Sequence, residues 1–322
     1  MNQVLLSSNV IAILFVESIL VLLAFIAFFW SIRIYKHWNF ESLQNSQYLL
    51  EKKNYFTTTI IYFILLVKIL LLPFFASVVN ELSNIVPGAM CGAGVISAND
   101  FGFPIFFIKL FVLFLGVCWI LTNAIDLKSS YLFTKRKYEL FFLIFGLLIL
   151  EFCFVVLYFS NISLETPVAC CSVIYGTSDI GSKIPFNLDG ISLSLVFFIV
   201  SGLLFVSNQS TSKLLSFFLG VLFLYFGYYF VLHIVGIYIY ELPTHICPFC
   251  MLQKEYYFIG YPLWIALFLT SFFAMAPLVL NLLTKTENHT KAHTLSTIFN
   301  LLLVIISAYY LFSYYFKNGV WL

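Results

Sequence analysis

The chain has 322 residues, of which 62% are hydrophobic and only 9% are charged, and its formal net charge is +2. Because a soluble domain carries about 25% charged residues, this composition excludes a soluble globular protein with a single anchor. No basic surface interleaved with aromatic residues and no glycine-rich phosphate loop is present, so we expect no nucleic-acid partner.

Long apolar stretches repeat from end to end and predict an all-α, polytopic transmembrane helical bundle. The first stretch lacks a basic leader and is too long for a cleaved signal peptide, so we expect it to remain as a helix. The fifth stretch is the shortest. We predict eight spans, at about residues 8–32, 57–80, 104–125, 139–160, 190–207, 214–240, 256–282 and 295–316.

Lys and Arg alternate sharply between the connecting loops. The loops after spans 1, 3, 5 and 7 hold 11 basic residues, whereas the opposite loops hold three. Because positively charged loops stay in the cytoplasm, both termini are predicted to be extracytoplasmic. We therefore expect an integral protein of a bacterial inner membrane, surrounded by lipid.

Three cysteine sites recur at almost even spacing on the extracytoplasmic side. Cys91, Cys171 and Cys250 lie 80 and 79 residues apart, each in a polar loop that precedes a proline by 12–14 residues. We expect residues 1–322 to form a single integral membrane domain. The cysteine spacing predicts three tandem two-helix repeats within it, and the alternative is that the spacing arose by chance. The repeat units would be about 12–91, 92–171 and 172–250, followed by C-terminal helices at 251–322.

The last site is a Cys-x-x-Cys motif, Cys247-Pro-Phe-Cys250. Two intervening residues let the sulfur atoms meet across one turn, and such motifs lower the pKa of one thiol and so supply a reactive thiolate. Outside the cytoplasm a disulfide can also persist. The motif therefore favours a redox-active pair, with a structural disulfide or half of a metal site as the alternatives.

The segment from Cys247 to Lys254, CPFC followed by Met-Leu-Gln-Lys, resembles the motif of the bacterial disulfide-generating DsbB family and, more loosely, the vitamin K epoxide reductase superfamily. The resemblance implies that Cys247 and Cys250 pass electrons to a quinone near Gln253 and Lys254. It also implies an extracytoplasmic thiol protein as partner. The chain departs from these families in having about eight spans instead of four and no second cysteine pair spaced along a loop.

Cys170 and Cys171 are adjacent. Their Cα atoms are about 3.80 Å apart across a trans peptide, whereas disulfides prefer about 4.4–6.8 Å. One of the two is therefore expected to bond to another loop, such as that of Cys91, or both to bind a soft ion. In the redox interpretation, Cys91, Cys170 and Cys171 exchange disulfides with Cys247 and Cys250.

A copper site is the main alternative, because thiolates and thioethers select soft ions such as Cu(I). The protein would then bind, transport or deliver copper, and a metalloprotein would be its partner. The candidate ligands are Met90, Cys91, Cys170, Cys171, His245, Cys247, Cys250 and Met251. A third hypothesis is a structural subunit of a membrane complex, with disulfides joining its loops.

Ionisable residues also occur inside the apolar stretches. At that depth such groups are costly and usually pair or face the bundle interior. Glu17, Glu151 and His233 could form a proton path for quinone reduction. The alternative is that Glu17 and Glu151 pair with Lys68 and Lys109 and fix the packing of the helices.

Overall fold

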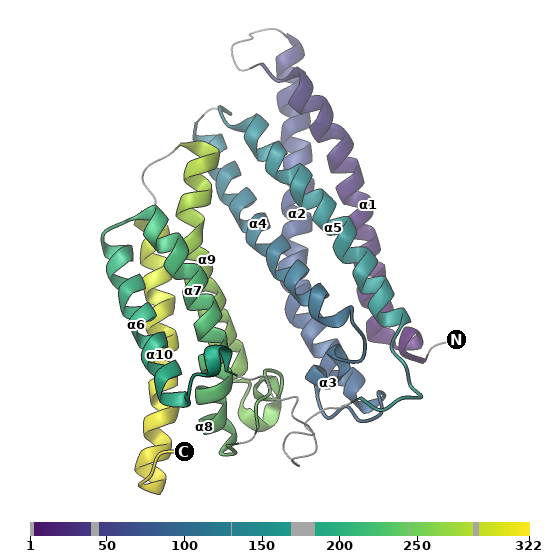
Figure 1. The fold of residues 1–322 in the computed structure, drawn as a ribbon. Helices are drawn as coiled ribbons and strands as arrows, with labels where there is room; N and C mark the ends of the chain where they lie inside the picture. Colours follow the sequence, from purple (N-terminus) through teal and green to yellow (C-terminus); the bar gives the residue numbers. More distant parts are fainter. Residues whose placement is uncertain (1–2, 40–44, 130, 169–183, 244, 286–289) are drawn as a thin grey trace. The chain divides into compact units, whose positions relative to one another are not determined.

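The computed structural model describes residues 3–39, 45–129, 131–168, 184–243, 245–285 and 290–322, and every regular element in these ranges is helical (Figure 1). Eight of the helices are long and apolar enough to cross a membrane. The prediction of an all-α polytopic bundle with eight spans is therefore confirmed.

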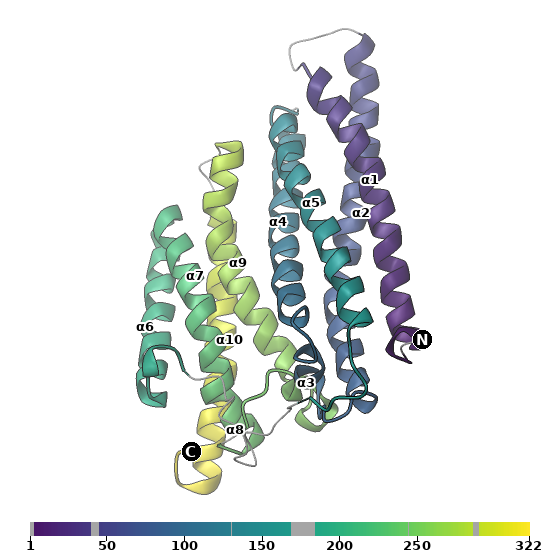
Figure 2. The ribbon, with the colours of Figure 1, turned by 45° about the vertical axis from the view of Figure 1, so that its right-hand side comes forward.

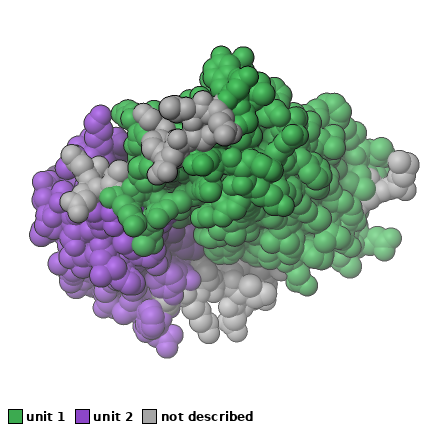
Figure 3. Space-filling view, turned by 90° about the horizontal axis from the view of Figure 1, so that it is seen from above, with its two compact units in different colours: residues 1–168, 282–285 green, residues 169–281, 286–322 purple. Residues whose placement is uncertain are grey.

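The chain divides into two compact units (Figure 3). Unit 1 comprises residues 1–168 with 282–285, and unit 2 comprises 169–281 with 286–322. The repeat boundaries predicted from the cysteine spacing stay predictions. Each unit carries four of the eight spans.

Unit 1 is an antiparallel bundle of four long helices (Figures 1 and 2). Helix α1 packs against α2 and α5, and α4 packs against α2 and α5. The short helix α3 precedes α4 and lies at the same end of the unit as the N-terminus. The elements are η1 (Gln3–Leu6), α1 (Ser8–His37), α2 (Asn45–Glu81), η2 (Leu82–Asn84), α3 (Gly92–Ile96), α4 (Gly102–Lys128) and α5 (Thr134–Ser160).

Unit 2 also has four spans, with its cysteine motif between the second and the third. Helix α6 packs against α7 and α10. A π-helical turn, η5, continues α7 into α8, so that these three elements form one span. The elements are η4 (Pro185–Asn187), α6 (Gly190–Gln209), α7 (Lys213–Phe230), η5 (Val231–Val235), α8 (Gly236–Tyr240), η6 (Cys250–Leu252), η7 (Lys254–Tyr256), α9 (Gly260–Thr284) and α10 (Thr290–Asn318).

Several helix ends differ from the predicted spans. Helices α1 and α2 continue past the apolar stretch into polar sequence, to His37 and back to Asn45, because a helix can extend beyond the hydrocarbon core. Helix α9 begins at Gly260 and not at 256. Tyr257 and Phe258 adopt left-handed backbone angles, with φ of 55° and 57°, and so interrupt the helix.

The distribution of side chains fits a lipid environment. Large apolar residues such as Leu70 and Phe107 are 70% and 72% exposed on the helix surfaces, whereas many polar side chains are buried between helices. In water such exposed apolar faces would be covered by a partner, but in a bilayer they contact lipid tails.

Candidate functional site

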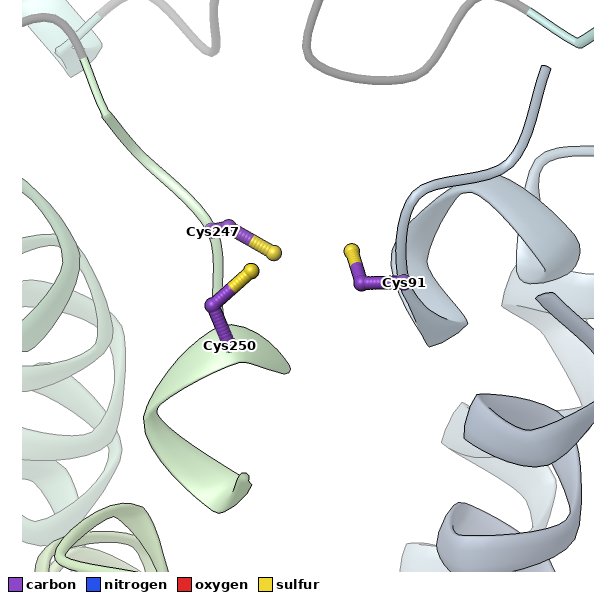
Figure 4. A group of neighbouring side chains, drawn as sticks. All are labelled: Cys91, Cys247 and Cys250. Atoms are coloured by element: carbon purple, nitrogen blue, oxygen red, sulfur yellow. The ribbon is translucent and has the colours of Figure 1, made fainter. Parts of the chain in front are cut away.

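The cysteine motif of unit 2 lies in the loop between α8 and α9. The Sγ atoms of Cys247 and Cys250 are within 4.8 Å of each other, and Figure 4 shows both sulfurs on the same side of the loop. Rotation of either side chain would bring them toward the S–S length of about 2.05 Å. The two residues are only 4% and 8% exposed, so the pair is sheltered from bulk solvent.

The hydroxyl group of Tyr240 clamps the loop around the pair. It donates a hydrogen bond to the carbonyl oxygen of Cys247 and accepts one, of 3.0 Å, from the backbone N–H of Met251. Tyr240 is the last residue of α8 and is buried. The end of a membrane-spanning helix thereby fixes the backbone on both sides of the motif.

Helix α9 holds the loop from the other side. The indole Nε1–H of Trp264 donates a 3.3 Å hydrogen bond to the carbonyl of Pro248, between the two cysteines. A Cβ at Gly260 would lie 2.5 Å from Cγ of Met251, so only glycine permits this close approach of the loop to the first turn of α9.

Aromatic rings surround the clamp. The ring of Tyr240 meets those of His245 and Tyr256 edge to face, with centroids 4.3 Å and 4.8 Å away. Burial raises the pKa of Tyr256, and negative charge on Cys250 and Glu255 raises it further.

The predicted quinone contacts lie directly after the motif. The backbone N–H of Gln253 donates a 3.0 Å hydrogen bond to the carbonyl of Cys250 and closes the helical turn η6. Lys254 is exposed. Their proposed role at a cofactor stays a prediction.

The predicted soft-metal ligands differ in their surroundings. Met251 is fully buried and packs against Gly236 and Gly260, whereas Met90 of unit 1 is 58% exposed. His245 is half-buried against Tyr240. Cys170 and Cys171 lie outside the described residues.

Cys91 occupies a comparable place in unit 1, in the loop between α2 and α4. It directly precedes α3, as Figure 4 shows, and is fully buried. The backbone N–H of Gly92 donates a 3.1 Å hydrogen bond to Oδ1 of Asn80, which ties the loop to the end of α2. Gly88 has a φ of +78° and permits the turn that enters this loop.

Four of the buried charged residues in the spans of unit 1 form a closed ring, each from a different helix. Lys109 Nζ lies 3.0 Å from Glu17 Oε1 and 2.6 Å from Glu151 Oε1. Lys68 pairs with Glu17 and lies 3.0 Å from Glu151 Oε2. All four side chains are at most 4% exposed, and the ring is neutral.

These ion pairs match the packing alternative that the sequence offered for Glu17 and Glu151. A cavity of about 10 Å³ beside Lys68, Lys109 and Glu151 has room for about one water. His233 lies in unit 2, in the π-helical turn, with its ring 6.0 Å from that of Tyr229. The proton path stays a prediction.

Lys137, which the count of loop charges assigned to a loop, is buried in the protein. Like Lys135 and Arg136 it lies in the first turn of α5, but unlike them it is fully buried, with its Nζ 2.9 Å from Oδ2 of Asp126. The Asp126 carboxylate also accepts hydrogen bonds from the N–H of Phe133 and the hydroxyl of Thr134, which explains why α5 begins before the predicted residue 139.

Sequence reasoning did not find Tyr240 and Trp264. Both lie in or beside apolar stretches, where a single Tyr or Trp does not stand out from the other apolar residues. Their hydrogen bonds to the motif depend on the tertiary structure. The only available signal was position, because Tyr240 lies seven residues before Cys247 and Trp264 lies 14 residues after Cys250, each near the end of a span.

Comparison with known proteins gives no match to the chain from any family, any curated protein or any solved structure.

Proposed function

We propose that the protein is a membrane thiol–disulfide oxidoreductase in which Cys247 and Cys250 form the redox-active pair. The observation that carries this proposal is the clamped motif, with two sulfur atoms within 4.8 Å. Tyr240 and Trp264 position the backbone of the motif from two spans. A pair that only crosslinked the loop would not require this support on both sides.

The chemistry has two stages. A substrate thiolate attacks the Cys247–Cys250 disulfide, one cysteine leaves as thiolate, and a second substrate thiol resolves the mixed disulfide. The substrate is thereby oxidised and the pair is reduced. Reforming the Cys247–Cys250 bond breaks two S–H bonds and releases two electrons and two protons, which a quinone takes up when it is bound.

A quinone is a suitable acceptor because the motif lies at the ends of membrane-spanning helices. Tyr240 ends one span and Trp264 lies in the first turns of the next. A lipid-soluble acceptor can approach such a site from the bilayer, whereas a thiol protein approaches from the aqueous side. Gln253 and Lys254 are the proposed polar contacts to the quinone.

We place this site outside the cytoplasm. Four spans lie between the loop of Cys91 and that of Cys247, so both loops are on one side of the membrane. Without the buried Lys137, ten of the remaining 13 loop-side basic residues are on the opposite side. A membrane-impermeant thiol reagent, applied to intact cells after mild reduction, should label the loop cysteines. Labelling only after lysis would contradict this orientation.

Copper binding is the second candidate, since two thiolates at this separation also suit Cu(I). Purified protein distinguishes the possibilities. Bound quinone and thiols that cycle between oxidation states support the oxidoreductase, and stoichiometric copper that is lost in Cys250→Ser supports a copper protein. Disulfides that do not cycle, with neither cofactor present, would indicate a structural subunit.

A further inference from the structure

The loops that follow the second span of each unit share a sequence pattern. In unit 1, Pro87 precedes Cys91 by four residues, and in unit 2, Pro243 precedes Cys247 by four. The third span then begins with Gly102-Phe-Pro in unit 1 and with Gly260-Tyr-Pro in unit 2. The two copies are offset by 156 residues at the cysteine and by 158 at the glycine.

The two glycines perform the same structural task. A Cβ at Gly102 would lie 2.0 Å from the carbonyl oxygen of Ile96, the last residue of α3. A Cβ at Gly260 would lie 2.5 Å from Cγ of Met251, in η6. In each unit, therefore, a short helical turn follows the cysteine and packs onto the first residue of the third span.

The correspondence continues along the third span. Fourteen residues after the glycine stand Gly116 and Ala274, both small. A Cβ at Gly116 would meet Leu65 of α2, and Cβ of Ala274 lies 2.9 Å from the position of a Cβ at Gly220 of α7. In both units this position is therefore the close contact between the third span and the second.

Seven residues further along the third span, both units carry an asparagine whose side-chain oxygen accepts a hydrogen bond from a lysine. Asn123 Oδ1 accepts a 3.0 Å hydrogen bond from Lys137, and Asn281 Oδ1 accepts a 3.1 Å bond from Lys213. The lysines come from different spans of their units, the fourth in unit 1 and the second in unit 2. The shared feature is thus the asparagine on the third span.

We propose that the chain is a tandem duplication of one four-span unit, in place of the two-helix repeats suggested by the cysteine spacing. In this duplication Cys91 is the counterpart of Cys247, and not of Cys250, whose place Gly94 takes. Unit 1 then keeps the frame of a Cys-x-x-Cys site with only its first cysteine. Resting on the proposed function, this makes Cys91 a thiol that forms a disulfide only with a cysteine outside its own loop.

The backbone of unit 1 supports such a frame. The N–H of Gly94 donates a 3.1 Å hydrogen bond to the carbonyl of Cys91, so residues 91 and 94 belong to one turn. The Cα atoms of such a turn are less than about 7 Å apart, which overlaps the range of about 4.4–6.8 Å that disulfides span. A cysteine at 94 could therefore reach Cys91.

The test installs the missing cysteine. In a chain with Cys170, Cys171, Cys247 and Cys250 replaced by Ser, Gly94→Cys should form a disulfide with Cys91 under a mild disulfide oxidant. Mass spectrometry after denaturation and alkylation should then find two fewer alkylated thiols than in a reduced sample. Gly92→Cys is the matched control, because neighbouring cysteines are too close for an unstrained disulfide, and it should stay fully alkylated.

Failure of Gly94→Cys to close under conditions that close Cys247–Cys250 in the unmodified chain would overturn the duplication. Thermal unfolding of Gly94→Ala, compared with that of the unmodified chain, shows whether the fold tolerates any side chain at position 94. If alanine is not tolerated there, position 94 is not equivalent to 250, which holds a side chain, and the proposal also fails. Neither readout depends on quinone turnover, so failure of the proposed function is detected separately.

Discussion

Replacing Tyr240 by Phe should release the loop that shelters the cysteine pair. The substitution removes only the hydroxyl group, and the ring contacts with His245 and Tyr256 are kept. Two hydrogen bonds are lost, one to the carbonyl of Cys247 and one from the N–H of Met251. Each is worth about 1 kcal/mol net, so opening of the loop should become about 2 kcal/mol easier.

That difference corresponds to about a 30-fold larger open population, because 1.4 kcal/mol is a factor of ten. Cys247 and Cys250 are nearly buried, so their alkylation requires loop opening. The reduced protein should therefore react about 30-fold faster with a bulky maleimide in Tyr240→Phe than in the unmodified chain. The assay is a stopped time course read by mass spectrometry.

Tyr256→Phe is the control, since its hydroxyl makes no hydrogen bond to the backbone of the described loop residues while its ring packs beside Tyr240. It should alkylate at nearly the rate of the unmodified chain. Equal rates in Tyr240→Phe and the unmodified chain would refute the clamp.

Two further substitutions test the packing of the units. Lys109→Met leaves two buried carboxylates with one lysine and should lower the free energy of unfolding by about 3–5 kcal/mol. The double variant Lys109→Met/Glu17→Gln restores a neutral pair and should recover much of this stability. If both variants lose the same stability in thermal unfolding, the ring of ion pairs is not supported. Gly260→Ala should lower the free energy of unfolding by about 1–3 kcal/mol, and with it the melting temperature, because its Cβ would overlap Met251 as in an overpacked core. Gly146→Ala should not destabilise the protein, because among the described residues no atom beyond its own helix backbone lies within 4 Å of the new Cβ. Equal destabilisation by both substitutions would contradict the close approach at Gly260.

The membrane spans could be predicted because the bilayer sets the length of an apolar helix. All eight were located, but their polar extensions were not, since the helix of α2 from Asn45 to residue 56 carries no apolar stretch. The start of α9 depends on the left-handed Tyr257 and Phe258, which no local propensity indicates.

The candidate site was only partly predictable. The spacing of Cys247 and Cys250 identifies a thiol pair by itself, because both residues belong to one short motif. Glu17 pairs with Lys68 and Lys109, which are far from it in sequence. Tyr240 is close to the motif in sequence, but it supports the motif through a single hydroxyl group. Such partners follow from helix packing, which the pattern of a single sequence does not specify.

In the proposed function, Cys247 and Cys250 form a pair that a quinone can oxidise. The most direct measurement starts from purified, fully reduced and metal-free protein, adds a soluble quinone, and counts alkylated cysteines by mass spectrometry while following quinone absorbance. We predict loss of the Cys247 and Cys250 alkylations with one quinone reduced per pair, and no quinone reduction in Cys250→Ser. Unchanged alkylation of both cysteines, or equal quinone reduction in the variant, would contradict the claim.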